Sequence, residues 1–286
     1  MVKLQVGLIG CGSIATSAHV PALRRLTALI DVRSVCDIRP AVAEGVAQTL
    51  GAAWTTDYRT LLDDPQLDAV VITTPEFLHA EQTIAAVEAG KHVLCEKPMA
   101  RTLAEADAML AAARASGVQL MIAHSRRFTP RYRRAHELLE AGAIGQPVLV
   151  RENERRPRVA GPGVPVSGWR PDPDKDTTWY AQARYAAGTA FHIGVHEMDL
   201  LRWFAGSEAR SVYMESKMTD PRQEVPDTVT LHVRFDKAQL TCSAPDHGPH
   251  GRRKQVSPPE RRSARPSRRA TGSGPRRARH SPGRGR

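Results

Sequence analysis

A glycine-rich loop that follows an apolar segment constrains this chain more than any other feature. Residues 2–9 are predicted to form a buried strand, and the loop after them opens a helix predicted to reach about residue 29. The loop reads Gly10-Cys11-Gly12-Ser13-Ile14-Ala15. The first glycine permits a tight turn, the second lets the backbone approach a pyrophosphate at the helix N-terminus, and a small third residue allows close packing of helix on strand. The loop predicts dinucleotide binding through Gly10, Gly12, Ser13 and Ile14.

An acidic residue stands where such a site needs one. Asp37 follows a short apolar strand predicted for residues 32–36 and lies 25 residues beyond Gly12, where a carboxylate accepts hydrogen bonds from the adenosine ribose. Its charge would repel a 2′-phosphate, so the sequence favours NAD as the cofactor. Arg39 could bind that phosphate, which keeps NADP as the open alternative. The competing interpretation is a glycine turn between packed elements, with Asp37 as a simple cap.

Strands and helices alternate through the first half of the chain. Further strands are predicted at residues 69–73, 92–95 and 119–123, and helices at residues 41–50, 60–62, 81–89 and 102–115. Two of these helices end at a glycine, Gly90 and Gly117, as helix C-caps prefer. Such alternation predicts an α/β fold, a doubly wound parallel sheet with helices on both faces.

Three further motifs carry a resemblance to a known family. They are Thr73-Thr74-Pro75-Glu76-Phe77-Leu78-His79, then Cys95-Glu96-Lys97-Pro98, and then the stretch 188–206, which contains Gly-Val-His-Glu-Met-Asp. In this order and spacing they resemble the glucose–fructose oxidoreductase, inositol dehydrogenase and rhizopine-catabolism (Gfo/Idh/MocA) family. The resemblance implies a Rossmann domain at residues 1–125 and an α+β domain with an open, mostly antiparallel sheet at residues 126–244.

The resemblance also implies an activity and its residues. The activity is hydride transfer between NAD(P) and a secondary alcohol of a small-molecule sugar, cyclitol or related polyol. Lys97 matches the family's active-site lysine and His196 its histidine. Thr74, Pro75, His79 and Glu96 match residues beside the cofactor, and Arg127, Trp169 and Arg170 match residues on the substrate side.

The expected chemistry assigns a role to each polar group. Oxidation of an alcohol needs a base that titrates near the working pH, which suits His196 as proton acceptor. Lys97 would hold the substrate oxygen and favour its developing negative charge. Asp199, three residues past His196, could orient the imidazole. The chain has His192 where the family often has Asp, and this residue could extend the relay or bind a substrate hydroxyl.

A metal site is the main alternative for the two histidines, which are spaced i, i+4. No Glu follows His192 as in the zincin pattern and no third ligand is evident, so the sequence predicts no metal. Two other functions stay open at this level. The chain could be a hydrolase or lyase that retains NAD and cleaves a bond through transient oxidation of its substrate. Net formation of NADH with substrate alone would distinguish a dehydrogenase from such an enzyme. A protein that binds the cofactor without catalysis would bind NAD and turn over no polyol.

The end of the chain has a composition of its own. Residues 245–286 hold 13 of the 41 basic side chains and two of the 30 acidic ones, which leaves the preceding residues with no net charge. Rich in Arg, Pro and Gly and without an aromatic ring, this segment is expected to be disordered. Its abrupt start suggests a shifted reading frame or a damaged end. The family's remaining strands would then be missing, so the strand expected at residues 228–235 would lie at or near a sheet edge. The full sheet from which the family's homo-oligomers assemble would be incomplete, so such a homo-oligomer is not expected here.

Composition also bears on partners and compartment. The basic tail has no aromatics for base stacking and no recognisable module, so no specific nucleic-acid partner is expected. Apolar runs are short, such as residues 69–72, so no membrane partner or secretory signal is expected. The four cysteines lack metal-type spacing. We therefore expect a cytoplasmic protein.

Overall fold

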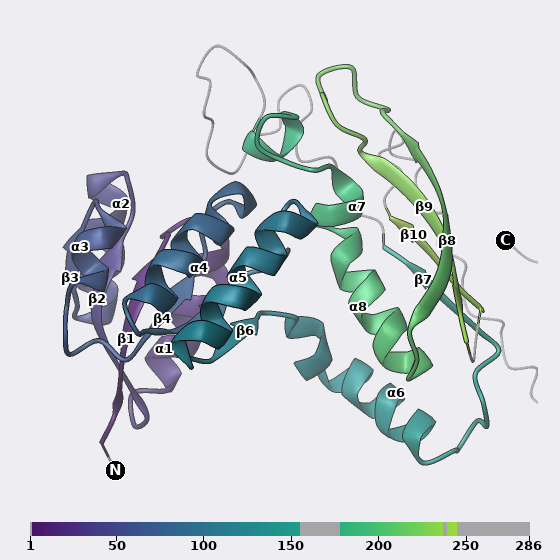
Figure 1. Ribbon diagram of the computed structural model, residues 1–286, viewed down its shortest axis with the longest axis horizontal. Coiled ribbons are helices and arrows are strands. Elements are labelled where there is room, and N and C mark those ends of the chain that lie inside the picture. The colour runs from purple at the N-terminus through teal and green to yellow at the C-terminus, as the bar shows by residue number, and fades with distance from the viewer. Residues whose placement is uncertain (1, 155–177, 237–238, 245–286) are drawn as a thin grey trace, which may run out of the picture. The chain divides into compact units, whose positions relative to one another are not determined.

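The computed structural model describes residues 2–154, 178–236 and 239–244 (Figure 1). Trp169 and Arg170, predicted on the substrate side, and residues 245–286, predicted to be disordered, lie outside the described residues. Among the described helices, none is long and apolar enough to cross a bilayer.

A six-stranded parallel sheet forms the N-terminal half. Its order is β3-β2-β1-β4-β5-β6, with bounds β1 Leu4–Ile9, β2 Ile30–Cys36, β3 Ala53–Thr55, β4 Ala69–Ile72, β5 His92–Cys95 and β6 Leu120–Ile122. The first strand, β1, lies in the middle of the sheet. The next two strands, β2 and β3, extend the sheet on one side and β4, β5 and β6 extend it on the other, so the strand order reverses between β1 and β4. The predicted doubly wound sheet is confirmed, and β3 is a strand that sequence reasoning missed, because three residues show no periodicity.

The helices of this half follow the predicted order. Their bounds are η1 Ala15–His19 (a π-helical turn), α1 Val20–Arg25, α2 Pro40–Leu50, α3 Tyr58–Leu62, η2 Glu76–Leu78 (a 3₁₀ turn), α4 His79–Glu88 and α5 Leu103–Ser116. The prediction that the first helix reaches residue 29 was wrong. The backbone leaves the helix at Leu26, and the amides of Leu29 and Ile30 close turns on the Leu26 carbonyl instead.

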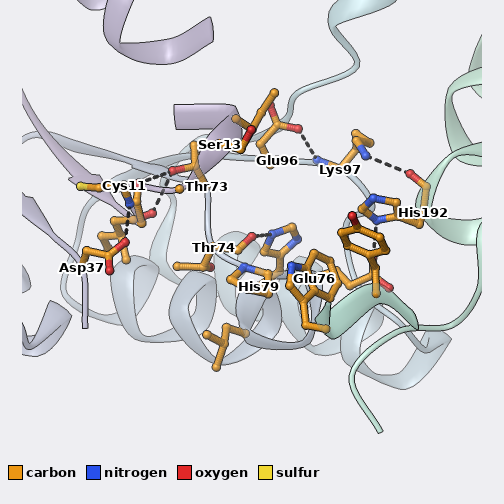
Figure 2. Close-up of a pocket in the computed structure, with 18 of the residues that line it drawn as sticks. Cys11, Ser13, Asp37, Thr73, Thr74, Glu76, His79, Glu96, Lys97 and His192 are labelled. Carbon is orange, nitrogen blue, oxygen red and sulfur yellow. Dashed lines mark hydrogen bonds and ion pairs between the residues drawn. The ribbon is translucent and has the colours of Figure 1, made fainter. Parts of the chain in front are cut away.

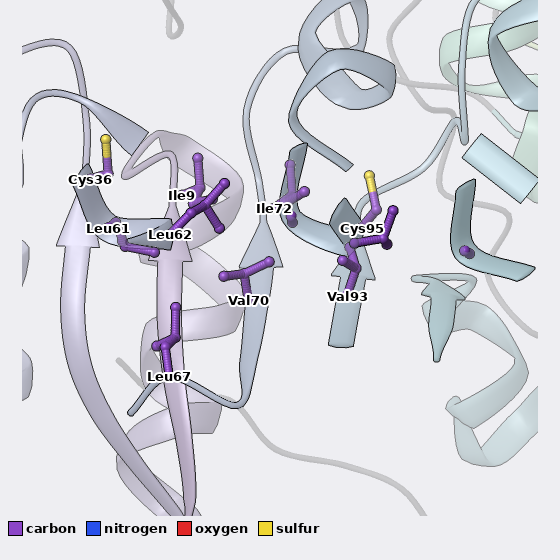
Figure 3. Packing of buried hydrophobic residues seen from close by; sticks show 12 residues of the cluster. Ile9, Cys36, Leu61, Leu62, Leu67, Val70, Ile72, Val93 and Cys95 are labelled. Carbon is purple, nitrogen blue, oxygen red and sulfur yellow. The ribbon is translucent and has the colours of Figure 1, made fainter. Parts of the chain in front are cut away.

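Apolar side chains cover both faces of the sheet. One cluster joins Ile9, Val70 and Ile72 of the central strands to Leu62 and Val93 (Figure 3). Cys36 and Cys95 lie in this cluster, and burial raises the pKa of both thiols to about 12. They therefore pack as small apolar groups at neutral pH. This core holds the strand ends, and the loops that follow them, in fixed positions.

The second half carries a four-stranded sheet with the order β7-β10-β9-β8. Its bounds are β7 Leu149–Asn153, β8 Ala209–Lys217, β9 Thr228–Phe235 and β10 Gln239–Ala244. All neighbours are antiparallel except β10 with β7, which confirms the mostly antiparallel sheet. The helical elements of this half are η3 Ser125–Phe128, α6 Pro130–Glu140, η4 Trp179–Ala181, α7 Thr189–His192 and α8 Gly194–Ala205.

Residues 228–235, predicted at or near a sheet edge, lie next to the edge strand β8. This strand, β9, lies between β8 and β10 and forms hydrogen bonds on both sides. Its inward-facing residues, among them Leu231 and Val233, pack against Leu201 and Ala205 of α8. Among the described strands of this sheet the edges are β7 and β8, and every residue of β8 is exposed.

The start of α5 offers a direct test of local stability. Thr102 accepts a hydrogen bond from the Glu105 amide, and the Glu105 carboxylate accepts one from the Thr102 amide, which completes a capping box. Thr102→Ala should lower the free energy of unfolding by about 1 kcal/mol, because the first turn loses a partner for its amides. Urea denaturation measures the change. The control Thr49→Ala removes an exposed hydroxyl inside α2 and should cost less; equal midpoints for the two variants would contradict the assignment.

Candidate functional site

The carboxyl ends of β1, β2, β4 and β5 border one cavity of about 710 Å³. Nearly all of the predicted cofactor and catalytic residues line it, namely Gly10, Gly12, Ser13, Ile14, Asp37, Arg39, Thr74, Pro75, His79, Glu96, Lys97 and His192. Figure 2 shows how residues from the strand ends meet His192 of the second half. In an open parallel sheet, this edge at the switch point is where ligands bind.

The two glycines of the loop have different physical reasons to be glycine. Gly10 has φ +94°, and a Cβ there would lie 2.8 Å from the Thr74 amide nitrogen and 2.9 Å from the Thr73 carbonyl carbon. A Cβ on Gly12 would meet nothing within 4 Å, although this residue lines the cavity. The space beside Gly12 is therefore open for a ligand to approach the backbone, as a dinucleotide pyrophosphate requires.

Asp37 is fixed from two sides. Its carboxylate accepts hydrogen bonds from the Cys11 amide (2.9 Å) and from the Arg39 amide (3.0 Å), and the Arg39 guanidinium pairs with it at 2.9 and 3.1 Å. Burial raises the pKa of Asp37, but the bonds from Arg39 and from the Cys11 amide outweigh it and hold the pKa below its ordinary value. The group is therefore an anion at neutral pH, and Arg39 is already engaged with it.

His79 joins the loops that follow β4 and β5. It is almost fully buried, with Nδ1 2.8 Å from the Pro98 carbonyl oxygen and Nε2 2.9 Å from the Thr74 carbonyl oxygen. Burial lowers the pKa of its imidazole, although both carbonyl contacts oppose this. The residue that was predicted beside the cofactor thus positions Thr74 and the segment after Lys97.

Lys97 reaches from the end of β5 to the second half of the chain. Its Nζ donates a hydrogen bond to the His192 carbonyl oxygen at 2.9 Å, and its amide donates to Glu96 Oε2 at 3.1 Å. The other Glu96 oxygen lies 2.8 Å from His19 Nε2. Burial raises the pKa of Glu96, but His19 and Lys97 hold it below its ordinary value. His19 could not be predicted as part of the site, because its partner Glu96 lies 77 residues away in the chain.

Glu76 is the site residue that sequence reasoning missed. Its carboxylate accepts a hydrogen bond from the Ala187 amide at 3.2 Å and lies 3.0 Å from His192 Nδ1. The ring of Tyr180 stacks on the same imidazole at 5.5 Å between centroids, and the Trp179 ring meets it edge-on at 5.4 Å. Glu76 stands inside a motif read from the sequence, but only the contact with His192 reveals its role.

Two predicted residues do not line this cavity. His196 and Arg127 are absent from its wall. The interpretation of Asp199 as the group that orients His196 was wrong: Arg127 donates to both Asp199 oxygens, at 2.6 and 2.8 Å, and the other partner of this carboxylate is His124 at 3.7 Å. A guanidinium offers two parallel donors that match a carboxylate, so it takes both oxygens. Among the described residues, no group of three His, Cys, Asp or Glu side chains could hold a metal ion.

Comparison with protein families matches both halves of the chain. The model described as "Oxidoreductase family, NAD-binding Rossmann fold" matches residues 4–124, and the "GFO/IDH/MocA C-terminal domain" model matches residues 132–257. The Rossmann half is thus an NAD-binding domain, which agrees with the cofactor predicted from the glycine loop.

The chain is also similar to individual dehydrogenases. The chain is 35% identical over 214 residues to levoglucosan dehydrogenase of Pseudarthrobacter phenanthrenivorans, covering 72% of this chain and 52% of that protein. It is 28% identical over 244 residues to myo-inositol 2-dehydrogenase of Thermotoga maritima, covering 83% and 66%. The solved structure of a levoglucosan dehydrogenase complex with NADH and L-sorbose is similar with a TM-score of 0.77 at 31% identity, covering 87% of this chain and 68% of that one. The chain spans about half to two thirds of the length of the curated relatives it matches.

The contrast between the two glycines can be tested. Gly12→Ala should leave the thermal stability unchanged but weaken NAD binding by on the order of tenfold or more, because the new methyl group occupies the approach to the backbone. Gly10→Ala should instead destabilise the fold, since its φ and its neighbours leave no room for a Cβ. Calorimetric titration with NAD and thermal melts separate the two effects. Full NAD affinity in folded Gly12→Ala would contradict this placement of the cofactor.

Proposed function

The chain belongs to the Gfo/Idh/MocA family of oxidoreductases, and from that premise we propose that it transfers a hydride between NAD and a secondary alcohol of a sugar, cyclitol or related polyol. One observation carries the proposal: Lys97 and His192 meet, through a 2.9 Å hydrogen bond from Nζ to the backbone carbonyl, in the cavity that the glycine loop and Asp37 also line. Cofactor-binding and proton-handling groups therefore share one space.

The residues present fit a nicotinamide dinucleotide. The open space beside Gly12 suits the pyrophosphate, and the Asp37 carboxylate stands at the end of β2 to accept hydrogen bonds from the adenosine ribose. When bound, the cofactor would supply the acceptor for the hydride that leaves the alcohol carbon. Lys97 would bind the alcohol oxygen through its ammonium group and stabilise the negative charge that develops there as the proton leaves.

The substrate end of the cavity suits a neutral, many-hydroxylated ring. Trp179 and Tyr180 offer aromatic surface, while Thr189, Asp220 and Gln223 offer polar groups in the same wall. A sugar or cyclitol presents both an apolar C–H face and hydroxyls, and it can use both kinds of contact. The names of the relatives, levoglucosan dehydrogenase and inositol dehydrogenases, agree with this class of substrate.

We assign residues 1–125 to cofactor binding and residues 126–244 to the substrate side. Contacts between these parts, such as those of Glu76 and Lys97 with His192, build the site. A cytoplasmic location agrees with a substrate and cofactor of this kind and with three free, buried cysteines among the described residues.

Lys97 provides the test of the proposed reaction. Lys97→Met should lower turnover by on the order of a hundredfold or more and leave NAD affinity largely intact, because the ammonium group acts mainly on charge that develops in the transition state. Steady-state assays with NAD and a panel of neutral sugars and inositols measure the change. Lys3→Met changes an exposed residue just before β1 that does not line the cavity, and it is the matched control. Equal turnover in the Lys97 and Lys3 variants would remove Lys97 from the reaction.

The pairing of Asp37 with Arg39 predicts the cofactor preference. The wild-type chain should bind NADH more tightly than NADPH, because the anion repels a 2′-phosphate and holds Arg39 away from it. Asp37→Ser should shift the ratio of the two dissociation constants toward NADPH by on the order of tenfold or more, since it removes the charge and frees the guanidinium. Fluorescence titration with both reduced cofactors measures the ratio. Tighter binding of NADPH by the wild type would overturn the assignment.

A further inference from the structure

We propose that Glu76 is a positioning residue for His192: its carboxylate holds the imidazole proton on Nδ1 and so makes Nε2 the ring atom that can accept a proton. The inference deepens the proposed function and rests on it for its catalytic meaning. The pairing itself can be tested without any substrate.

Glu76 is a buried acidic residue, and its carboxylate therefore needs hydrogen-bonding partners. Its side chain is 1% exposed, at the first residue of η2, directly after Pro75. A carboxylate removed from water is costly unless it is paired and hydrogen-bonded. Its two partners are the Ala187 amide at 3.2 Å and His192 Nδ1 at 3.0 Å. Both come from the second half of the chain, and His192 is the ionisable one.

The contact fixes the chemistry of the imidazole. An ionised carboxylate only accepts hydrogen bonds, so the nitrogen 3.0 Å from it must carry the proton. In a neutral imidazole the other nitrogen, Nε2, then has the lone pair. When Nε2 takes up a proton, the ring becomes a cation, and the adjacent carboxylate stabilises it. Glu76 therefore makes His192 a stronger base and determines which atom acts.

Several other groups face the same imidazole. Lys97 Nζ donates a hydrogen bond to the backbone carbonyl of His192. Its positive charge disfavours protonation of the imidazole, whereas the negative charge of Glu76 favours it. The Tyr180 ring stacks on the imidazole, and the Trp179 ring borders it. Two further carboxylates line the cavity, Asp220, which pairs with Arg222, and Asp227, which accepts hydrogen bonds from Thr219. Of these three carboxylates, Glu76 is the one 3.0 Å from His192 Nδ1.

The arrangement differs from the one expected from the sequence, in which His196 accepts the proton and Asp199 orients it. His192 lines the cavity and His196 does not, while Asp199 is bound by Arg127. The carboxylate–histidine pair has therefore one member from the loop after β4 and one from α7. The histidine that replaces the family's frequent Asp thus has a carboxylate of its own beside it.

Nitrogen NMR of ¹⁵N-histidine-labelled protein tests the pairing. His192 is assigned by loss of its signals in His192→Asn. The wild type should show neutral His192 protonated on Nδ1. Glu76→Gln keeps a hydrogen-bond acceptor but loses the charge, so the pKa of His192 should fall by about one unit or more. Glu81→Gln is the matched control, because this carboxylate accepts hydrogen bonds from Tyr58 and Arg59 and does not itself line the cavity; it should leave the pKa of His192 unchanged.

Two results would overturn the proposal. One is neutral wild-type His192 protonated on Nε2, which decides the question even if Glu76→Gln does not fold. The other is a folded Glu76→Gln protein with the wild-type pKa at His192. A second readout is the pH dependence of kcat/KM with an active polyol: its acidic limb, where kcat/KM falls as the base becomes protonated, should move to lower pH in Glu76→Gln as the NMR pKa does. Absence of turnover with every polyol would count against the proposed function, while the NMR result would still decide the role of Glu76.

Discussion

The parallel register of the first sheet is the constraint from which the site follows. Because β1 pairs in parallel with β2 and β4, and β4 with β5, the loops after all four strands leave the sheet at the same edge. Hydrogen bonds then fix these loops to one another: the Thr73 hydroxyl to the Gly10 carbonyl, and His79 to the carbonyls of Thr74 and Pro98. The glycine loop, Asp37 and Lys97 lie around one cavity as a consequence, although 87 residues separate the first from the last.

The second half completes this edge through a small number of directed contacts. Lys97 bonds the backbone of His192, and Glu76 bonds both the Ala187 amide and the His192 ring. Each contact gives a buried or half-buried charged group a hydrogen-bonding partner. These contacts therefore fix the positions of the charged groups in the cavity wall. Nearby, Arg126 pairs with Glu154 and Glu197 on the side of the second sheet. Burial, with Glu154 nearby, raises the pKa of Glu197 to about 8, so this group can hold a proton at neutral pH.

Local signals explain what could be predicted from the sequence. The turn at Gly10, the end of α5 at Gly117 and the apolar runs of the central strands depend on neighbours within a few residues, and each was predicted. Contacts across long stretches of chain were not. The pairing of Glu76 with His192 spans 116 residues and that of Arg127 with Asp199 spans 72. The strand β3 also depends on a partner, β2, that only the folded sheet supplies.

Transfer of a labelled hydride tests the central claim most directly. The protein is incubated with NAD and a panel of neutral sugars, anhydrosugars and inositols that carry deuterium on their carbinol carbons, and the NADH formed is analysed by mass spectrometry. The account predicts deuterium in the nicotinamide ring in equal amount to the ketone produced, with at least one member of the panel. Binding of NAD with no labelled NADH from any of these substrates would contradict it.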